Sequence, residues 1–243
     1  MEVRNVIVGV IFVVVLYLVY VFVFKNKHSS LVTTQKVDSS IKVDIPGTNS
    51  SNAYSLWLYV SEWDVDEKKH IMTRYSKCNA ENNVNCFSPT VYLGQSSNTL
   101  YIDYLLNNTL DSISISDFPI QSWTNLIIST NTKTVDVYIN GKLVRSHILR
   151  IPPPIPNGKL YLGRLNKVSN NYPNEGPETN NLNSYTGYIS TVNYFDEPIT
   201  PSDAWSIYNK GYDDAGLNAN ILGKYKIKMS ILDNNREVNS MEI

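Results

Sequence analysis

The chain has 243 residues, with 21 Lys and Arg against 22 Asp and Glu, which gives a formal net charge of -1. A chain this close to neutral lacks the basic excess that nucleic-acid phosphates require, so the sequence predicts no nucleic-acid partner. Its 17 tyrosines, together with abundant Ile, Asn and Ser, suit strands and turns better than helices. The length is sufficient for a membrane anchor and one β-domain.

The first element is an apolar run from Val6 to Phe24 that contains no charged residue. As a helix rising 1.5 Å per residue, it would cross roughly the ~30 Å hydrocarbon layer of a bilayer. We therefore expect a single transmembrane helix within an anchor of residues 1–28, with the lipid bilayer as a partner, and a stalk over residues 29–36. A cleavable signal peptide is the alternative; the run is long for one, and no A-x-A site follows it.

The orientation of this anchor is open. Lys25 and Lys27 after the run outnumber Arg4 before it, which favours a C-terminal part facing the cytoplasm. Sequons at Asn49 and Asn107 would instead be glycosylated in the secretory lumen. In a chain this rich in Asn, Ser and Thr, such sequons also arise by chance.

Alternation of apolar and polar residues then predicts a series of strands. They cover Ile41–Ile45, Tyr54–Val60, Ile71–Tyr75, Val91–Leu93, Leu100–Leu106, Ser112–Ile115, Leu160–Leu162 and Gly187–Phe195. In the second of these strands, Leu56 and Leu58 face one side, while Trp57 and Tyr59 face the other.

The only two cysteines, Cys78 and Cys86, flank an Asn-rich loop between two of these strands. In an oxidising compartment they could bridge the neck of the loop, whereas in a reducing compartment they would be two free thiols. Two cysteines without a nearby histidine fall short of the four ligands of a zinc site. The sequence leaves the two thiol states open.

The central stretch, residues 123–149, predicts three consecutive antiparallel strands. Leu126–Ile128 is an apolar run, and Val135–Ile139 alternates strictly before Asn140-Gly141 and a further apolar run. An Asn-Gly pair between alternating segments is a strong hairpin signal, because both residues tolerate the positive φ of a type I′ turn. This antiparallel meander is the basis of the fold prediction.

A rigid crossing and a long loop follow the meander. Ile151–Pro156 cannot lie inside a sheet, because proline donates no backbone hydrogen bond. Lys167–Ser184 is polar and rich in Asn, and a loop of this length is either functional or disordered. We favour a binding rim, whose candidate residues are Asn170, Asn171, Tyr172, Asn174, Asn180, Asn181 and Tyr185.

A short helix is expected after the last long strand. Thr200 or Ser202 can cap it, and it would run through Tyr208 and end near Gly211. Trp205 would pack this helix against the sandwich.

Two further patterns concern the late strands. Ile189 and Val192 do not alternate cleanly, which indicates a bulge. In the C-terminal tail, residues 214–243, Lys224–Leu232 alternates strictly. We favour a last strand of the sandwich there over an edge strand that pairs with a partner chain.

The order of these segments resembles one known family. YSLWLYV, a strand opened by Trp123, VDVYINGKLV, LYLGR and GYISTVNYF precede a short helix, as in the laminin-G/pentraxin branch of the concanavalin A-like lectin/glucanase superfamily. The resemblance covers residues 37–213 and implies an all-β fold, a two-sheet antiparallel jelly-roll sandwich preceded by one transmembrane helix. Family members commonly carry an acidic pair where this chain has Ser190 and Thr191, so calcium cannot be placed and no cofactor is predicted.

The strongest catalytic candidate is the acidic segment that holds Glu62, Asp64 and Glu67. Retaining laminarinase-type hydrolases of the same fold use an E-x-D-x-(x)-E strand, with two carboxyl groups about 5–5.5 Å apart on one sheet face. By that resemblance Glu62 would be the nucleophile, Asp64 the helper and Glu67 the acid. However, Trp63 replaces an aliphatic residue, and the segment falls where the laminin-G pattern has a loop. We therefore expect a solvated acidic turn and no enzyme.

The anchor, the charge bias and the composition are similar to those of virion membrane proteins of large icosahedral double-stranded DNA viruses. This resemblance implies a non-catalytic structural protein, of the minor capsid type, that links an internal membrane to capsid components. The alternative is a cell-surface or luminal lectin that binds glycans through Lys167–Ser184. A glycoside hydrolase is a distant third.

Overall fold

The computed structural model describes Tyr17 and residues 30–45, 49–79, 84–107, 109–155, 158–164, 182–212, 228–233 and 236–242. Side chains at residues 75–79, 84–87, 182 and 228–242 are outside this description. The predicted anchor Val6–Phe24 also lies outside it, apart from Tyr17. Within the described residues, no helix is both long and apolar enough to cross a bilayer.

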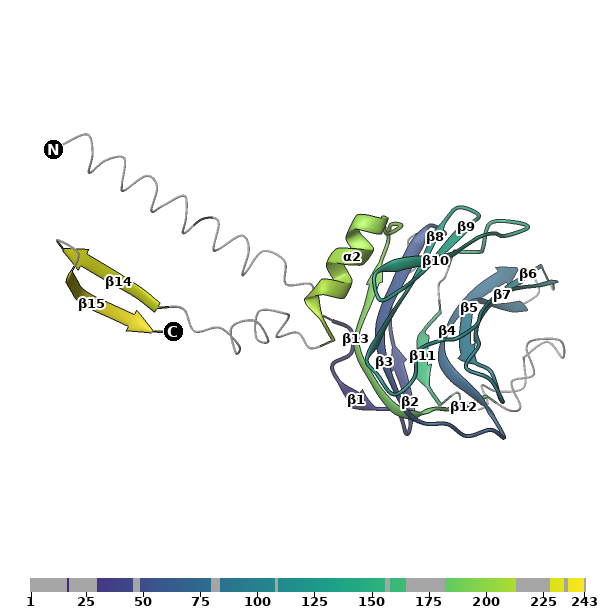
Figure 1. Cartoon of the computed structure of the whole chain (residues 1–243). Coiled ribbons are helices and arrows are strands. Elements are labelled where there is room, and N and C mark those ends of the chain that lie inside the picture. Colours follow the sequence, from purple (N-terminus) through teal and green to yellow (C-terminus); the bar gives the residue numbers. More distant parts are fainter. Residues whose placement is uncertain are drawn as a thin grey trace. The chain divides into compact units, whose positions relative to one another are not determined.

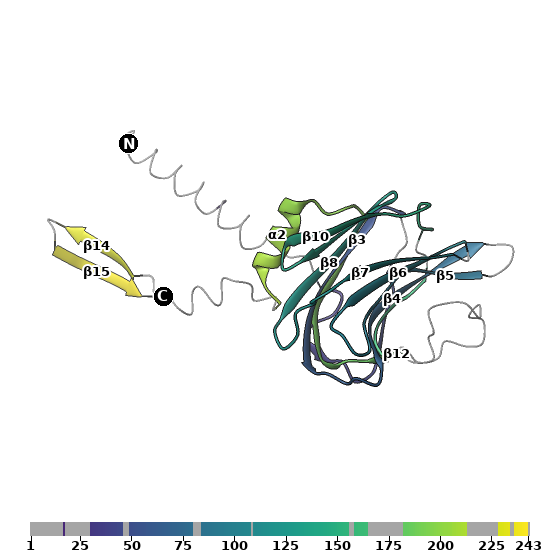
Figure 2. The same ribbon diagram turned by 45° about the vertical axis from the view of Figure 1, so that its right-hand side comes forward.

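Two β-sheets pack face to face around one apolar core (Figures 1 and 2). The first sheet has the order β1 (Gln35–Lys36), β13 (Thr186–Phe195), β3 (Asn52–Glu62), β8 (Thr124–Asn131), β9 (Thr134–Ile139) and β10 (Lys142–Ile148). The second has the order β2 (Ser40–Val43), β11 (Leu160–Gly163), β4 (Lys68–Asn79), β5 (Val84–Leu93), β6 (Leu100–Leu106) and β7 (Thr109–Ile115). A seventh strand of this sheet, β12 (Leu182–Ser184), pairs with β4 in parallel, whereas the other pairs are antiparallel. The expected all-β sandwich is confirmed.

The core follows from strand alternation. Leu56 and Leu58 of β3 point inward and meet side chains of the opposite sheet such as Val91 and Ile102, and all four are at most 1% exposed. Full burial of such a side chain contributes roughly 1.5–3 kcal/mol. Period-two patterning therefore decides which face of each strand closes the sandwich.

The predicted hairpin joins β9 and β10. Asn140 and Gly141 adopt φ values of 51° and 74°, and Ile139 pairs with Lys142 across the turn. These are the positive dihedrals that a two-residue turn of this type requires. A Cβ on Gly141 would also approach the Trp205 ring to 3.0 Å, so the turn needs glycine for two independent reasons.

The helix α2 (Pro201–Lys210) forms where it was expected. Thr200 and Asp203 make a capping box, proline opens the first turn, and Gly211 ends the helix with its N–H donating to the Tyr208 carbonyl. The helix packs on the outer face of the six-stranded sheet through a small apolar cluster around Ala204. Trp205 packs against the sandwich less than expected. Its ring lies over Gly141, and the residue stays 47% exposed.

The bulge expected in β13 is present. The register against β3 shifts between Ser190 and Asn193, and Thr191 adopts a φ of 47°. This extra residue lets Tyr188 and Ser190 point outward while Ile189 and Val192 both remain in the core.

The C-terminal strand does not join the sandwich, so that expectation is wrong. β14 (Lys228–Asp233) pairs with β15 (Arg236–Glu242) in a two-stranded sheet of its own. Asn234 and Asn235 separate the two strands in the sequence, and a short Asn-containing connection favours a local hairpin. Local pairing also costs less loop-closure entropy than joining a distant strand.

Candidate functional site

Three aromatic residues lie side by side across the outer face of the six-stranded sheet. Tyr188 of β13 is in register with Tyr59 of β3, and Trp123 lies immediately before β8, beside Tyr59. The ring centroids are 6.5 Å apart for Tyr188 and Tyr59, and 5.7 Å apart for Tyr59 and Trp123. Alternation directs these rings outward, because their neighbours Leu58 and Ile189 point into the core.

A fourth ring comes from the segment after α2. Tyr212 stacks on Trp123 with a centroid distance of 4.4 Å and an interplanar angle of 8°. The Tyr212 carbonyl accepts hydrogen bonds from Ser190 Oγ and from Thr191 Oγ1, the latter at 2.6 Å. The two residues that stand where the resemblance calls for an acidic pair therefore hold this ring in place.

We call Tyr188, Tyr59, Trp123 and Tyr212 the aromatic ladder. Tyr188 is 42% exposed and Tyr212 is 37% exposed, and the other two are half-buried. Trp57 lies buried next to the ladder, with its ring stacked on Tyr208 of α2 at 5.6 Å. The ladder is therefore a preassembled surface that rests on buried aromatic packing.

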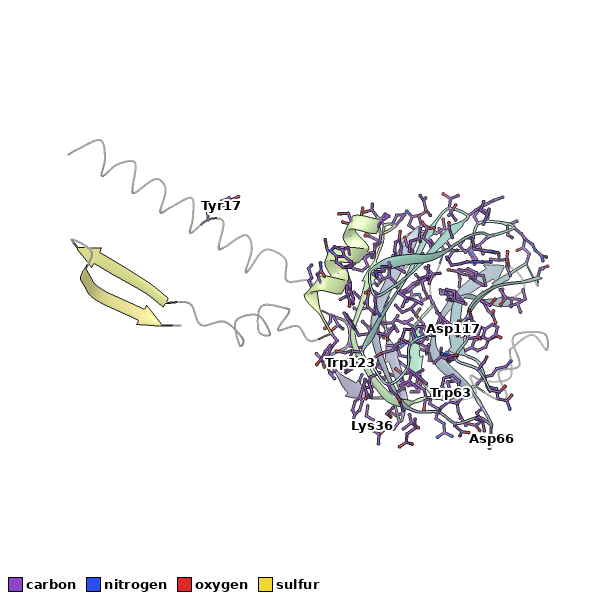
Figure 3. The ribbon with its side chains drawn as sticks, viewed as in Figure 1. Tyr17, Lys36, Trp63, Asp66, Asp117 and Trp123 are labelled. Carbon is purple, nitrogen blue, oxygen red and sulfur yellow. The ribbon has the colours of Figure 1, made fainter. Side chains whose placement is uncertain are left out.

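A lysine extends the same row of residues. Lys36 of β1 pairs in register with Tyr188, and its side chain is exposed. Figure 3 shows Lys36 and Trp123 on this part of the domain. The row across the sheet thus reads from the edge strand as Lys36, Tyr188, Tyr59 and Trp123.

The acidic segment does not form the arrangement that a retaining hydrolase needs. Glu62 is the last residue of β3, whereas Asp64 and Glu67 lie in the turn that follows, where Asp64 Oδ1 accepts a hydrogen bond from the Asp66 N–H at 2.9 Å. Because the chain leaves the sheet after Glu62, strand alternation cannot bring these carboxylates onto one face. The expected turn is present, and the catalytic pattern is not formed on this segment.

The turn is organised by Lys69, a residue that sequence reasoning missed. Its ammonium donates to the backbone carbonyls of Asp64, Glu67, Gly94 and Gln95. Lys69 Nζ also lies 4.0 Å from the centroid of the Trp63 ring, and the residue is only 2% exposed. Burial lowers the pKa of Lys69, while the neighbouring Asp64 and Glu67 carboxylates oppose that change. One buried cation thus joins the β3–β4 and β5–β6 turns.

The predicted binding rim is mostly outside the described residues, including Asn170, Asn171, Tyr172, Asn174, Asn180 and Asn181. Tyr185 is described and is not a rim residue, because it is 1% exposed in the core and its hydroxyl donates to the Tyr188 carbonyl. Where the chain re-enters the sheet in β12, Asn183 donates a hydrogen bond to Glu67. The acidic turn therefore also anchors the end of this long connection.

The outer face of the seven-stranded sheet carries a different aromatic and polar group. The carboxylate of Asp103 accepts hydrogen bonds from Tyr92 at 2.9 Å and from Ser112. Tyr92 stacks on Tyr101 at 5.2 Å. Asp103 is 1% exposed, and this burial raises its pKa, although the two donated hydrogen bonds act in the opposite direction.

His70 forms a second buried polar group on that sheet. Its Nδ1 bonds to the Gly163 carbonyl, and its Nε2 lies 2.7 Å from the Thr73 hydroxyl, which lies 3.3 Å from that of Thr90. Burial lowers the pKa of His70 to about 4, so the ring is neutral at pH 7 and donates through Nδ1. In each of these two groups the buried polar atoms bond to partners within the protein, which indicates a structural role.

The remaining predicted residues are placed as follows. Asn49 and Asn107 are exposed, so the acceptor asparagine of each sequon is accessible. Cys78 and Cys86 lie in the adjacent strands β4 and β5, where Cys86 pairs with Ser76, and their side chains are outside the description. Among the described residues, no three His, Cys, Asp or Glu side chains are grouped to hold a metal ion.

The two packed antiparallel sheets define a concanavalin A-like β-sandwich domain. Residues 33–204 match the Laminin_G_3 family model, described as the concanavalin A-like lectin/glucanases superfamily. The chain therefore belongs to this family. A search of curated proteins finds no match.

Solved structures with the same fold include binding domains of botulinum neurotoxins. One is the serotype D binding domain, with a TM-score of 0.52, 14% identity, and coverage of 72% of this chain and 42% of that chain. A second is the receptor binding domain of the C/D mosaic serotype, with a TM-score of 0.53, 13% identity, and coverage of 74% and 43%. A third is the serotype DC binding domain in complex with rat synaptotagmin II, with a TM-score of 0.52, 16% identity, and coverage of 72% and 42%. The chain thus spans less than half the length of these structures, and the likeness shows the fold alone.

Proposed function

We propose that this protein is a non-catalytic, membrane-anchored interaction protein whose sandwich binds a partner protein through the edge strand β10. The observation that carries the proposal is the apolar exposure of this edge. Leu143, Val144 and Ile148 are 51%, 44% and 72% exposed. β10 pairs with β9 on one side and forms the end of the six-stranded sheet. A sheet edge with exposed apolar side chains is a template for strand addition.

The charge of this edge indicates the chemistry of the partner. Lys142, Arg145 and Arg150 are exposed along β10 and the residues after it. A basic and apolar edge selects a partner strand that presents acidic and apolar side chains, because like charges placed opposite each other are unfavourable.

The position of this edge also fits a linking role. In the six-stranded sheet, β1 lies at one end, close in sequence to the N-terminal segment, and β10 lies at the other end. A domain anchored through its N-terminal side would present β10 as the opposite edge of the same sheet. This arrangement supports the more specific proposal that the chain is a virion protein that joins an internal membrane to capsid components.

The test uses purified particles that carry the full-length protein. Detergent removes the membrane, and the protein retained with the shell is then measured. We expect the wild-type protein to remain and a Leu143→Glu, Val144→Glu variant to be released. Val65→Glu, at a 58% exposed position in the β3–β4 turn, is the matched control and should stay with the shell. Release of the wild-type protein, or retention of the double variant, would contradict the proposal.

The non-catalytic part of the proposal has its own test. Purified protein should hydrolyse β-glucans at background level, and Glu62→Gln should leave that level unchanged. The placement of Asp64 and Glu67 in a turn around Lys69 supports this expectation. Robust hydrolysis that Glu62→Gln abolishes would instead support a glycoside hydrolase.

Glycan binding is the second candidate function, and the exposed aromatic ladder is the observation that favours it, because sugars stack on Tyr and Trp rings. This function would accompany a cell-surface or luminal location. Glycans attached to Asn49 and Asn107 in the native protein would support that location, whereas two unmodified asparagines agree with a domain that faces the cytoplasm.

A further inference from the structure

We infer that the aromatic ladder lies in the lipid headgroup layer of the same bilayer that holds the N-terminal segment. The inference rests on the proposed membrane anchoring and adds a second, peripheral contact made by the folded domain. Its occupant is the bilayer surface, and not a second copy of the chain or a free sugar.

The path of the chain keeps this part of the domain close to the bilayer. The Leu31 N–H donates to the Val192 carbonyl at 2.7 Å, so the chain joins the six-stranded sheet at this residue. Phe24 ends the apolar run, and 31 − 24 gives seven Cα–Cα steps from Phe24 to Leu31. Seven residues span at most about 25 Å when fully extended. An anchor that ends at Phe24 would therefore have its last residue within about 25 Å of Leu31, whatever the path between them.

The ladder begins close to that entry point. β1 pairs with β13, and Lys36 is in register with Tyr188, four residues along β13 from Val192. Four strand residues correspond to roughly 13 Å. A domain held this closely at its entry point can place Tyr188 and the rings beside it on the bilayer surface.

The chemistry of the ladder suits a headgroup layer. Tyr and Trp combine an apolar ring with a polar tip and are enriched at membrane–water interfaces. Lys36, in the ladder's row, and Lys210, at the end of α2, are exposed and can meet lipid phosphates. Glu62 lies at the end of β3, so the three charges named here sum to only +1. We therefore expect the rings to dominate, with contact already formed on zwitterionic lipid.

The ring geometry is less suited to a sugar. One face of Trp123 is covered by Tyr212, which stacks on it at 4.4 Å. Tyr59 is inclined to Trp123 by 54° and to Tyr188 by 59°. The ladder therefore does not present one flat platform of the kind on which a pyranose face stacks, whereas a bilayer interface requires no such platform.

The experiment measures tryptophan fluorescence of the full chain reconstituted in phosphatidylcholine vesicles that contain brominated lipid. Bromines placed near the headgroup should quench more strongly than bromines near the acyl chain end. Trp123→Phe should lose most of this shallow quenching. The matched control Trp63→Phe removes a ring held against Lys69 and should retain it.

The outcomes separate this inference from the anchoring on which it rests. Carbonate extraction of the same vesicles reports anchoring, so a released protein contradicts the proposed function. An anchored protein whose shallow quenching is equal in the wild type and in Trp123→Phe overturns the inference alone. A Tyr188→Ser, Tyr212→Ser variant gives a second test, because it should also lose shallow quenching while Trp123 is retained. Protection of Trp123 emission by soluble oligosaccharides, without lipid quenching, would assign the ladder to glycans instead.

Discussion

The outer faces of the two sheets carry similar residues and use them in opposite ways. On the six-stranded sheet, Tyr188 is 42% exposed and its ring contacts another ring of the ladder. On the seven-stranded sheet, Tyr92 is 7% exposed and donates a hydrogen bond to the buried Asp103. An outward-pointing tyrosine on a strand is therefore a binding candidate only where its ring and hydroxyl are not already used inside the protein.

The substitution with the largest expected effect disrupts the pairing of the two strands, β13 and β3, that carry Tyr188 and Tyr59 of the aromatic ladder. In Gly187→Ala, the new Cβ would lie 1.8 Å from the Tyr59 carbonyl oxygen, and backbone cannot yield there without separating β13 from β3. We expect a loss of at least about 4 kcal/mol in the free energy of unfolding, or failure to fold. Thermal unfolding of the full chain in detergent measures this loss of stability.

Gly211→Ala is the control for that substitution. A Cβ at Gly211 meets no atom within 4 Å, although the φ of 85° is unfavourable for alanine. Its cost should be about 1–3 kcal/mol from backbone strain alone, because φ 85° with ψ 177° lies in a region that is essentially restricted to glycine. Similar melting temperatures for the two variants would show that the close approach of β13 to β3 is not as described.

The second prediction concerns the buried face and pH. The pKa of His70 falls from 6.5 to about 4 on folding, so the unfolded chain binds a proton more readily than the folded one in this range. The contribution of neutral His70 to the free energy of unfolding is therefore complete above pH 6.5 and is lost as the pH falls toward 4. The full loss is about 3 kcal/mol. Urea unfolding at a series of pH values measures this change in the free energy of unfolding.

His70→Asn tests the origin of that slope. This variant should be less stable than the wild type at pH 7, because it gives up the bonds to Gly163 and Thr73. Its stability should depend less steeply on pH between 6.5 and 4, since the titrating group is gone. An unchanged slope would place the pH dependence in another group.

The smallest effect compares the two faces directly. Tyr92→Ser removes a ring stacked on Tyr101 and one of the donors to Asp103, and should cost about 3 kcal/mol. Tyr188→Ser removes a partly exposed ring and should cost less than about 1 kcal/mol. Unfolding midpoints of the two variants measure a difference of about 2 kcal/mol. Equal costs would mean that both faces are structural.

Local patterns in the sequence were sufficient for much of the fold. Alternation located the sandwich strands, Asn140-Gly141 predicted the hairpin, and Thr200 and Gly211 marked the ends of α2. These features depend on side-chain period, on positive φ and on capping groups within a few residues of one another. They can therefore be inferred without knowing which strands are neighbours.

Part of the candidate site was also visible in the sequence. Trp57 and Tyr59 were expected on the face opposite Leu56, and they lie there. The ladder itself could not be inferred, because it brings together residues from β13, β3, the segment before β8 and the segment after α2. Nothing in the sequence next to Tyr212 indicates that it stacks on Trp123.

Residue patterns alone were therefore enough to predict the series of β-strands, the central hairpin and the capped helix, whereas the two-sheet arrangement was implied by the family resemblance. Only the packing of the strands shows that Tyr185 is buried, that Lys69 joins two turns, and that Tyr188 is exposed on one sheet while Tyr92 is buried and hydrogen-bonded on the other. The physical reason is that burial and hydrogen-bond satisfaction depend on contacts between strands far apart in the chain. Alternation fixes the side of a strand on which a residue lies, but not what covers that side.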